Sequence, residues 1–213
     1  MTTDAATRGR FITLEGGEGA GKSTQARLLV DALTHAGIDA LATREPGGSP
    51  GAEAIRKLLL GGGPEAWDGE TEALLMVAAR RDHLVHTIRP ALTARRWVVC
   101  DRFADSTLAY QGYGRGLPLE ALRALHRFIC DGVQHPDLTL ILDLPVEIGL
   151  ARASDRNRFE NMVKDFHERM REGFLTIARQ ASERCVVIDA TGTVESVRRA
   201  VAAAVRERLG VAL

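Results

Sequence analysis

Short apolar runs alternate with longer stretches along this chain of 213 residues, and in the longer stretches apolar residues recur every three or four positions. The short runs have the length and composition of buried parallel strands, and the longer stretches have the spacing of amphipathic helices. Strands that alternate with helices predict an α/β fold, in which helices cover both faces of a parallel sheet. The expected strands are residues 11–14, 39–43, 97–101, 138–143 and 185–189.

The longest stretch with helical spacing, residues 71–93, contains Pro90. Proline has no amide hydrogen and disfavours the helical conformation of the residue before it, so we expect a kink or break near Arg89. The sequence contains no repeat, low-complexity tract or linker, and we expect a single domain, residues 1–213, that begins with a tail of about ten residues. The expected helices are residues 22–35, 52–60, 71–93, 105–110, 118–131, 145–153, a stretch that ends near 184, and 194–209.

Composition argues against several classes of protein. Hydrophobic residues make up 45% of the chain and charged residues 26%, which is ordinary for a globular protein. The 28 basic and 28 acidic residues cancel, so we expect no nucleic-acid or membrane partner. No apolar run approaches the roughly 20 residues that span a membrane, and the first ten residues lack the apolar segment of a secretory signal. We therefore expect a cytoplasmic protein.

Residues 16–23, with the sequence GGEGAGKS, follow the first expected strand and open the first expected helix. They match the phosphate-binding P-loop pattern GxxxxGK[ST], which needs this strand–loop–helix context. The glycines let backbone amides approach an anion, and the start of the helix points its unpaired amides to the same place. Lys22 can reach the β- and γ-phosphates, and the Ser23 hydroxyl can bind Mg²⁺. The expected nucleoside polyphosphate site consists of Gly16, Gly17, Glu18, Gly19, Ala20, Gly21, Lys22, Ser23 and Thr24.

Two aspartates, Asp101 and Asp143, end expected strands, and the loop of residues 44–51 follows another. Ligands of open parallel sheets bind beyond the carboxyl ends of the strands, so we expect residues 44–51, Asp101 and Asp143 to face the same crevice as the P-loop. Asp101 either orients Mg²⁺, directly or through water, or caps the helix that follows it. The chain has no Asn-Lys-x-Asp motif for reading guanine, which argues against a GTPase switch.

Four segments of the chain together resemble those of thymidylate kinases: EGGEGAGKS at 15–23, TREPGG at 43–48, DRF at 101–103 and STLAYQG at 106–112. The resemblance extends from about residue 10 to residue 207. It implies a P-loop NTPase-type, three-layer α/β/α fold with a five-stranded parallel sheet and a small helical lid near residues 150–160. It also implies a homodimer that uses Mg²⁺ and transfers the γ-phosphoryl group of ATP to dTMP, giving dTDP and ADP.

The resemblance further implies which side chains bind dTMP. Arg44 and Arg102 would hold the acceptor phosphate, because paired guanidinium nitrogens match a phosphate dianion, unless they are surface ion-pair partners. Glu18 would face the sugar and its 3′-hydroxyl, and Tyr110 would pack on the sugar where its ring blocks a 2′-hydroxyl. Arg80 would contact the phosphate or the base. The full set, in which Thr107 and Gln111 lie near the thymine edge, is Glu18, Arg44, Pro46, Met76, Arg80, Arg102, Ser106, Thr107, Tyr110 and Gln111.

Phosphoryl transfer needs positive charge that closes over the moving phosphoryl group. In this family the closing arginine comes either from the P-loop or from the lid. The P-loop of this chain has no arginine, so the chain resembles the bacterial lid-arginine type, although which lid arginine reaches the phosphate stays open. The expected catalytic residues are Lys22, Arg102, Arg152, Arg156 and Arg158.

Three alternatives remain at this stage. The chain could phosphorylate another deoxynucleotide, or it could be a deoxynucleoside kinase that recruits Glu18 or Glu45 as a base for an uncharged 5′-hydroxyl. The two phosphate-directed arginines, Arg44 and Arg102, argue against a nucleoside acceptor. The third alternative is a P-loop regulatory module, which would bind nucleotide without acceptor-dependent turnover.

Met76 stands four residues before Arg80, where this family commonly has a phenylalanine that stacks on thymine. Methionine packs on a ring with weaker and less oriented contacts than an aromatic side chain. We therefore predict that Met76→Phe keeps or lowers the KM for dTMP, measured by steady-state kinetics at saturating ATP. A large rise in that KM would show that residue 76 does not lie beside the base.

Overall fold

Five parallel strands form the centre of the computed structural model, which describes residues 8–63, 65–130, 135–153, 159 and 162–213. The strand order is β2-β3-β1-β4-β5, and all four neighbouring pairs run parallel. The predicted α/β class and the five-stranded parallel sheet are therefore confirmed. The strands are β1 (Phe11–Glu15), β2 (Ala40–Arg44), β3 (Trp97–Asp101), β4 (Leu138–Asp143) and β5 (Cys185–Asp189).

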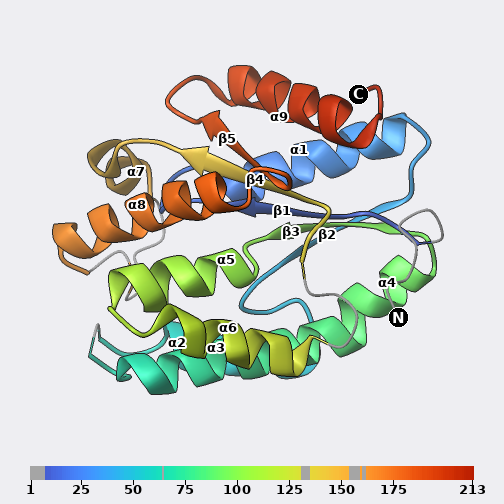
Figure 1. The fold of residues 1–213 in the computed structure, drawn as a ribbon. Coiled ribbons are helices and arrows are strands. Elements are labelled where there is room, and N and C mark those ends of the chain that lie inside the picture. Colours follow the sequence, from blue (N-terminus) through green and yellow to red (C-terminus); the bar gives the residue numbers. More distant parts are fainter. Residues whose placement is uncertain (1–7, 64, 131–134, 154–158, 160–161) are drawn as a thin grey trace.

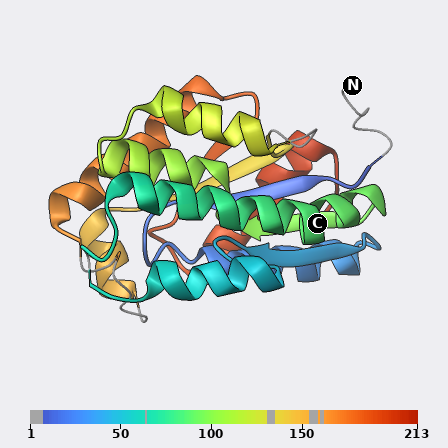
Figure 2. The same ribbon diagram turned by 90° about the horizontal axis from the view of Figure 1, so that it is seen from below.

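Helices cover both faces of this sheet and give three layers (Figure 1). Helices α1 and α9 lie against one face, and α5, α8, α3 and α6 lie on the other side, where α2 packs against α3 (Figures 1 and 2). Within the described residues, no helix is long and apolar enough to cross a membrane. The α-helices are α1 (Lys22–His35), α2 (Pro50–Leu60), α3 (Gly69–His83), α4 (Arg89–Thr93), α5 (Ala104–Thr107), α6 (Leu119–Ile129), α7 (Val146–Arg152), α8 (Lys164–Gln180) and α9 (Val194–Leu209).

The central strand β1 pairs with β3 and β4 along its two edges, and it is buried on both faces because helices pack on each side of the sheet. Ile12 and Leu14 point into the hydrophobic core that the sheet shares with α1 and α9. Phe11 points the other way, into a second core with Phe103 and residues of α3 and α6. Fully burying each of these side chains contributes roughly 1.5–3 kcal/mol. This double burial fixes the register of β1 and with it the position of the loop that follows the strand.

Two π-helical segments were not predicted from the sequence. One of them, η1 (Leu84–Ile88), joins α3 to α4, and there the Arg89 amide bonds to Leu84 O, five residues back. The break that Pro90 predicted near Arg89 is therefore a change of helix type, and helical structure continues to Thr93. The second segment, η2 (Leu108–Gly114), extends the helix expected at 105–110. Such segments are rare and often lie at functional sites.

Candidate active site

The P-loop has the backbone that its glycines predict. Gly16, Gly19 and Gly21 all have positive φ angles, of 128°, 65° and 85°, which are strained for any other residue. A side chain would also collide with the neighbouring backbone, because a Cβ atom added to Gly19 would lie 2.0 Å from Gly149 O. At Gly19 the loop thus lies too close to the chain beyond β4 to tolerate a side chain, and the loop leads directly into α1.

Lys22 lies inside the P-loop, where Nζ donates to Gly17 O at 2.5 Å. Burial is the main cause that lowers the pKa of Lys22, to about 8, and the positive charge of Arg102 acts in the same direction. A phosphate anion bound in the loop would oppose both effects and favour the charged ammonium group. The geometry therefore suits an anionic ligand better than an uncharged one.

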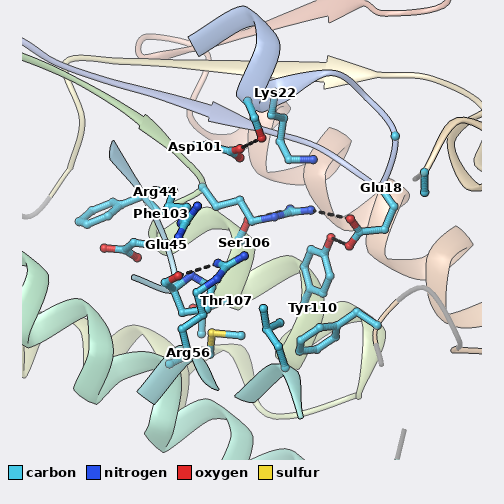
Figure 3. A pocket seen from close by; sticks show the side chains of 18 of the residues that line it. Glu18, Lys22, Arg44, Glu45, Arg56, Asp101, Phe103, Ser106, Thr107 and Tyr110 are labelled. Atoms are coloured by element: carbon cyan, nitrogen blue, oxygen red, sulfur yellow. Dashed lines mark hydrogen bonds and ion pairs between the residues drawn. The ribbon is translucent and has the colours of Figure 1, made fainter. Parts of the chain in front are cut away.

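The Ser23 hydroxyl donates to the Asp101 carboxylate, so the last P-loop residue and the end of β3 meet beside Lys22 (Figure 3). Both groups offer the oxygen ligands that Mg²⁺ prefers. Within the described part of the chain, no group of three or more His, Cys, Asp or Glu side chains could hold a metal ion. Mg²⁺ usually takes one or two protein ligands and completes its shell with water and substrate phosphates.

A cavity of about 520 Å³ lies beyond the carboxyl ends of β1, β2 and β3. It is lined by every dTMP-binding residue expected from the sequence, as well as by much of the P-loop and by Arg152. Lys22 and Asp101 lie on one side of the cavity, and Arg56, Thr107 and Tyr110 lie on the other (Figure 3). Of the expected P-loop residues, Gly16, Gly17 and Ala20 do not line it. Arg156 and Arg158 lie outside the described residues.

Among the arginines that line the cavity, three come from three different elements near the P-loop: Arg44 at the end of β2, Arg56 on α2 and Arg102 after β3. The sequence did not indicate Arg56, which donates to Pro46 O at 2.7 Å. Burial, reinforced by the charge of Arg44, lowers the pKa of Arg56. Like charges held this close favour a ligand that is itself negative, and a phosphate dianion matches several guanidinium forks.

Arg102 and Tyr110 both bind the P-loop carboxylate Glu18. Tyr110 donates to Glu18 Oε1 at 2.6 Å, and Arg102 Nη2 donates to Oε2 at 3.2 Å. Burial alone would raise the pKa of Glu18, but the charges of Arg102 and Lys22 outweigh it and hold the pKa below its ordinary value. The Arg102 guanidinium also lies over the Tyr110 ring, 4.8 Å from its centre. These contacts join the P-loop to Arg102 and to η2 across the cavity.

Arg80 and Glu45 form a buried ion pair at the far wall, with Arg80 Nε 2.7 Å from Glu45 Oε2. Arg80 Nη2 also donates to Phe103 O at 3.0 Å and to Thr107 Oγ1 at 2.9 Å. Met76 packs nearby with the apolar residues that border this end of the cavity. A guanidinium group beside an apolar wall can recognise a flat, polar-edged ring.

Glu15, the last residue of β1, supports the cavity from behind. Its carboxylate accepts hydrogen bonds from Phe103 N at 2.8 Å and from Ser106 Oγ at 2.5 Å. Burial, together with the charge of Asp105, raises the pKa of Glu15 to about 7. Nothing in the sequence indicated this role, because Glu15 directly precedes the P-loop and its partners lie about 90 residues further on.

A family model of thymidylate kinase matches residues 14–201. The chain belongs to the thymidylate kinase family.

Individual relatives agree with this family assignment. A thymidylate kinase of Caulobacter vibrioides is 55% identical over 208 residues, which cover 96% of this chain and all of that protein. One from Rhodopseudomonas palustris is also 55% identical, over 95% of this chain and 90% of that protein. The crystal structure of thymidylate kinase from Ehrlichia chaffeensis matches with a TM-score of 0.76 at 35% identity, over 92% of this chain and 98% of that one. The P-loop NTPase-type fold expected from the sequence is thereby confirmed.

The raised pKa of Glu15 gives this family member a testable pH dependence. Between the ordinary glutamate pKa of 4.5 and about 7, folded Glu15 keeps a proton that the unfolded chain has released. This group therefore makes the free energy of unfolding fall as pH rises through that window. In Glu15→Gln, which cannot titrate, we expect a smaller fall between pH 5 and pH 8, measured by urea unfolding. An identical fall in both proteins would contradict the raised pKa.

Proposed function

We propose that this chain phosphorylates dTMP to dTDP with Mg²⁺–ATP as the phosphoryl donor, a step toward dTTP. The observation that carries the proposal is one continuous cavity that joins the P-loop to Arg44, Arg56 and Arg102. A kinase that transfers a phosphoryl group between two anions must hold both of them in line and cancel their charge. Membership of the thymidylate kinase family supplies the identity of the acceptor.

The donor triphosphate binds at residues 16–24 in this proposal. The amides at the start of α1 and the Lys22 ammonium group hold the β- and γ-phosphates. Ser23 and Asp101 would hold Mg²⁺, which neutralises charge on the phosphates when bound. Because Asp101 ends β3 and Ser23 begins α1, the sheet sets the position of the metal site relative to the P-loop.

The acceptor phosphate binds at Arg44, Arg56 and Arg102. This phosphate is already ionised at neutral pH, so the reaction needs no strong general base. Glu18 and Tyr110 border the sugar, where the Tyr110 ring, held by its bond to Glu18, leaves little room for a 2′-hydroxyl. The base then lies toward the wall formed by Pro46, Met76, Arg80, Ser106, Thr107 and Gln111.

A nucleoside acceptor is a weaker alternative. It would need a free carboxylate base near an uncharged hydroxyl. Glu18 already accepts hydrogen bonds from Arg102 and Tyr110, and Glu45 is buried between Arg80 and His83. Both carboxylates are therefore committed to neighbouring side chains, which lowers their basicity. A regulatory module that only binds nucleotide would have no need for the acceptor side of the cavity.

We also propose that the enzyme is cytoplasmic and that each chain forms one P-loop domain. Two copies of the chain would associate as a homodimer, as expected from the resemblance. Apolar side chains are exposed on α2, α3 and α6, which pack together on the outer side of the molecule (Figure 2). They include Leu58, Leu74 and Phe128, and Phe128 is 84% exposed. A second copy with the same surface would bury these side chains.

The choice of acceptor tests the proposed function. We expect ADP release from Mg²⁺–ATP to be fastest with dTMP, slower with dUMP and nearly absent with UMP, because Tyr110 crowds a 2′-hydroxyl. A coupled spectrophotometric assay with dTMP, dUMP, UMP, AMP, CMP and thymidine supplied singly would measure this order. Turnover with thymidine alone would indicate a nucleoside kinase, and turnover that ignores the acceptor would leave only the P-loop function.

The arginines of the lid give a second test. Arg152 lies beside the P-loop and donates to Ala190 O at 2.8 Å and to Thr191 O at 2.7 Å, on the donor side of the cavity. We expect kcat to fall by about a thousandfold in one or two of the single variants Arg152→Ala, Arg156→Ala and Arg158→Ala, because an arginine on the moving phosphoryl group contributes ~10³–10⁵ in rate. Three small effects in single-turnover measurements would refute a lid arginine.

A further inference from the structure

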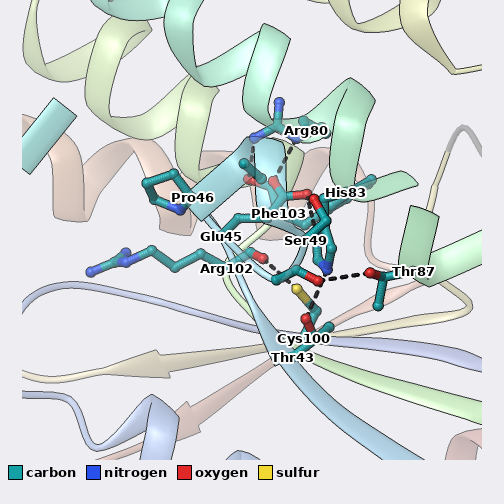
Figure 4. Close-up of polar contacts among 12 residues, drawn as sticks. Thr43, Glu45, Pro46, Ser49, Arg80, His83, Thr87, Cys100, Arg102 and Phe103 are labelled. Carbon is teal, nitrogen blue, oxygen red and sulfur yellow. Dashed lines mark hydrogen bonds and ion pairs between the residues drawn. The ribbon is translucent and has the colours of Figure 1, made fainter. Parts of the chain in front are cut away.

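A row of polar contacts runs from β2 to the wall of the cavity (Figure 4). Thr43 Oγ1 lies 2.7 Å from His83 Nε2, and His83 Nδ1 lies 3.1 Å from Glu45 Oε1. The other carboxylate oxygen of Glu45 accepts from Arg80 Nε at 2.7 Å. His83, Glu45 and Arg80 are all buried, and the His83 side chain is fully so. In a buried row of this kind each member restricts the orientation of the next.

The charge of Glu45 decides which group donates the hydrogen bond between His83 and Glu45. Burial would raise the pKa of Glu45, but Arg80 and His83 outweigh it and hold the pKa below its ordinary value, so the group is a carboxylate. A carboxylate can only accept hydrogen bonds. His83 must therefore carry a hydrogen on Nδ1 and donate it to Glu45, which leaves Nε2 to face the Thr43 hydroxyl.

Glu45 in turn fixes the guanidinium group of Arg80. With Nε bound to Glu45, Nη2 reaches both Phe103 O and Thr107 Oγ1, and the guanidinium lies 5.1 Å from the centre of the Phe103 ring. These contacts hold the plane of the Arg80 side chain where it forms part of the cavity wall. A Glu45 carboxylate that lost its His83 contact could rotate and would release this plane.

The His83 ring also fills the space between α3 and the loop that follows β2. A Cβ atom added to Gly48 would lie 2.4 Å from His83 Nε2 and 2.4 Å from Thr43 Oγ1, so the loop backbone packs directly on this contact. Thr87 Oγ1 donates to Gly48 O at 2.7 Å and ties the same loop to the helix. His83 is therefore placed to fix the loop and the helix relative to each other.

We propose that His83 is a positioning residue for the acceptor: its Nδ1–H holds Glu45, and Glu45 holds Arg80 in the orientation that contacts the bound nucleotide. The inference rests on the proposed function, because it assigns Arg80 to the acceptor side of the cavity. His83 itself does not line the cavity. Its contribution should therefore appear in acceptor binding and leave donor binding unchanged.

Two amide substitutions, His83→Asn and His83→Gln, distinguish the roles of the two ring nitrogens of His83. Asn at position 83 can place its NH₂ group near the position of Nδ1 and keep the bond to Glu45, whereas Gln reaches the position of Nε2 and keeps only the Thr43 contact. We expect His83→Gln to raise the KM for dTMP about tenfold and His83→Asn to raise it less than threefold, because a hydrogen bond to a charged group is lost only in the former. The KM for ATP should stay within twofold in both.

A matched control is His86→Gln, which changes an exposed histidine three residues further along the same helical stretch. It should leave both KM values unchanged. Equal effects of Gln and Asn at position 83, or equal rises in the KM for ATP and for dTMP, would overturn the proposal. Failure of the proposed function would look different, because wild-type protein would then show no turnover with dTMP.

Arg80→Met tests whether His83 acts through Arg80. If it does, His83→Gln should raise the KM for dTMP in wild-type protein and add little in the Arg80→Met background, which a double-mutant cycle measures directly. Fold-changes that multiply in the double variant would show that His83 acts by another route and would refute the proposal. If turnover of Arg80→Met is too slow for a KM to be measured, the double-mutant cycle can be built from the Kd of dTMP, measured by calorimetry.

Discussion

Arg102 holds the two halves of the cavity together, and much of the site depends on its position. Its backbone has a φ angle of 70°, in the left-handed region that favours glycine, and its amide donates to Leu14 O. A non-glycine residue in this conformation is strained and persists only where its surroundings fix it. The guanidinium group then reaches Gly16 O and Glu18 on the P-loop and lies over Tyr110 on η2. The end of β1 thus positions one side chain that contacts both the P-loop and η2.

Basic side chains outnumber acidic ones around the cavity. The whole chain has no net charge, yet the described side chains that line the cavity include six basic and three acidic ones. A cleft of one sign attracts ligands of the opposite sign and raises their local concentration. The three acidic side chains, Glu18, Glu45 and Asp101, are themselves bound to neighbouring donors. The lining thus carries a surplus of positive charge, and one of its members, Arg44, also pairs with Glu53 at 3.2 Å.

Two buried glutamates support opposite sides of this site and differ in their partners. Glu45 faces the full positive charge of Arg80, which outweighs burial and keeps it ionised. Glu15 is bound to an amide and a hydroxyl and lies near a second carboxylate, so burial prevails and its pKa rises to about 7. The first glutamate is therefore a permanent anion that orients a cation, and the second can change charge near neutral pH. Equal burial gives opposite electrostatic behaviour because the neighbouring charge differs.

The sequence by itself determined the strands, the P-loop and the expected acceptor residues. The bounds of β3, β4, β5, α1 and α9 agree with the apolar pattern, because periodicity and loop composition are local properties. The P-loop is equally local, since its pattern occupies eight consecutive residues, and family-specific segments led us to expect Arg44, Arg102 and Tyr110 at the site, all of which line the cavity.

Only the tertiary structure decided the rest. The sequence did not indicate Arg56, the support by Glu15 or the contact of His83 with Glu45. Such contacts join residues that lie far apart in the chain: Glu15 and Ser106, for example, are 91 positions apart. The two π-helical segments were also settled by packing, because neither has a signature in the sequence. Local patterns can indicate which residues reach the cavity, but the contacts that orient them form only when distant segments are packed against one another.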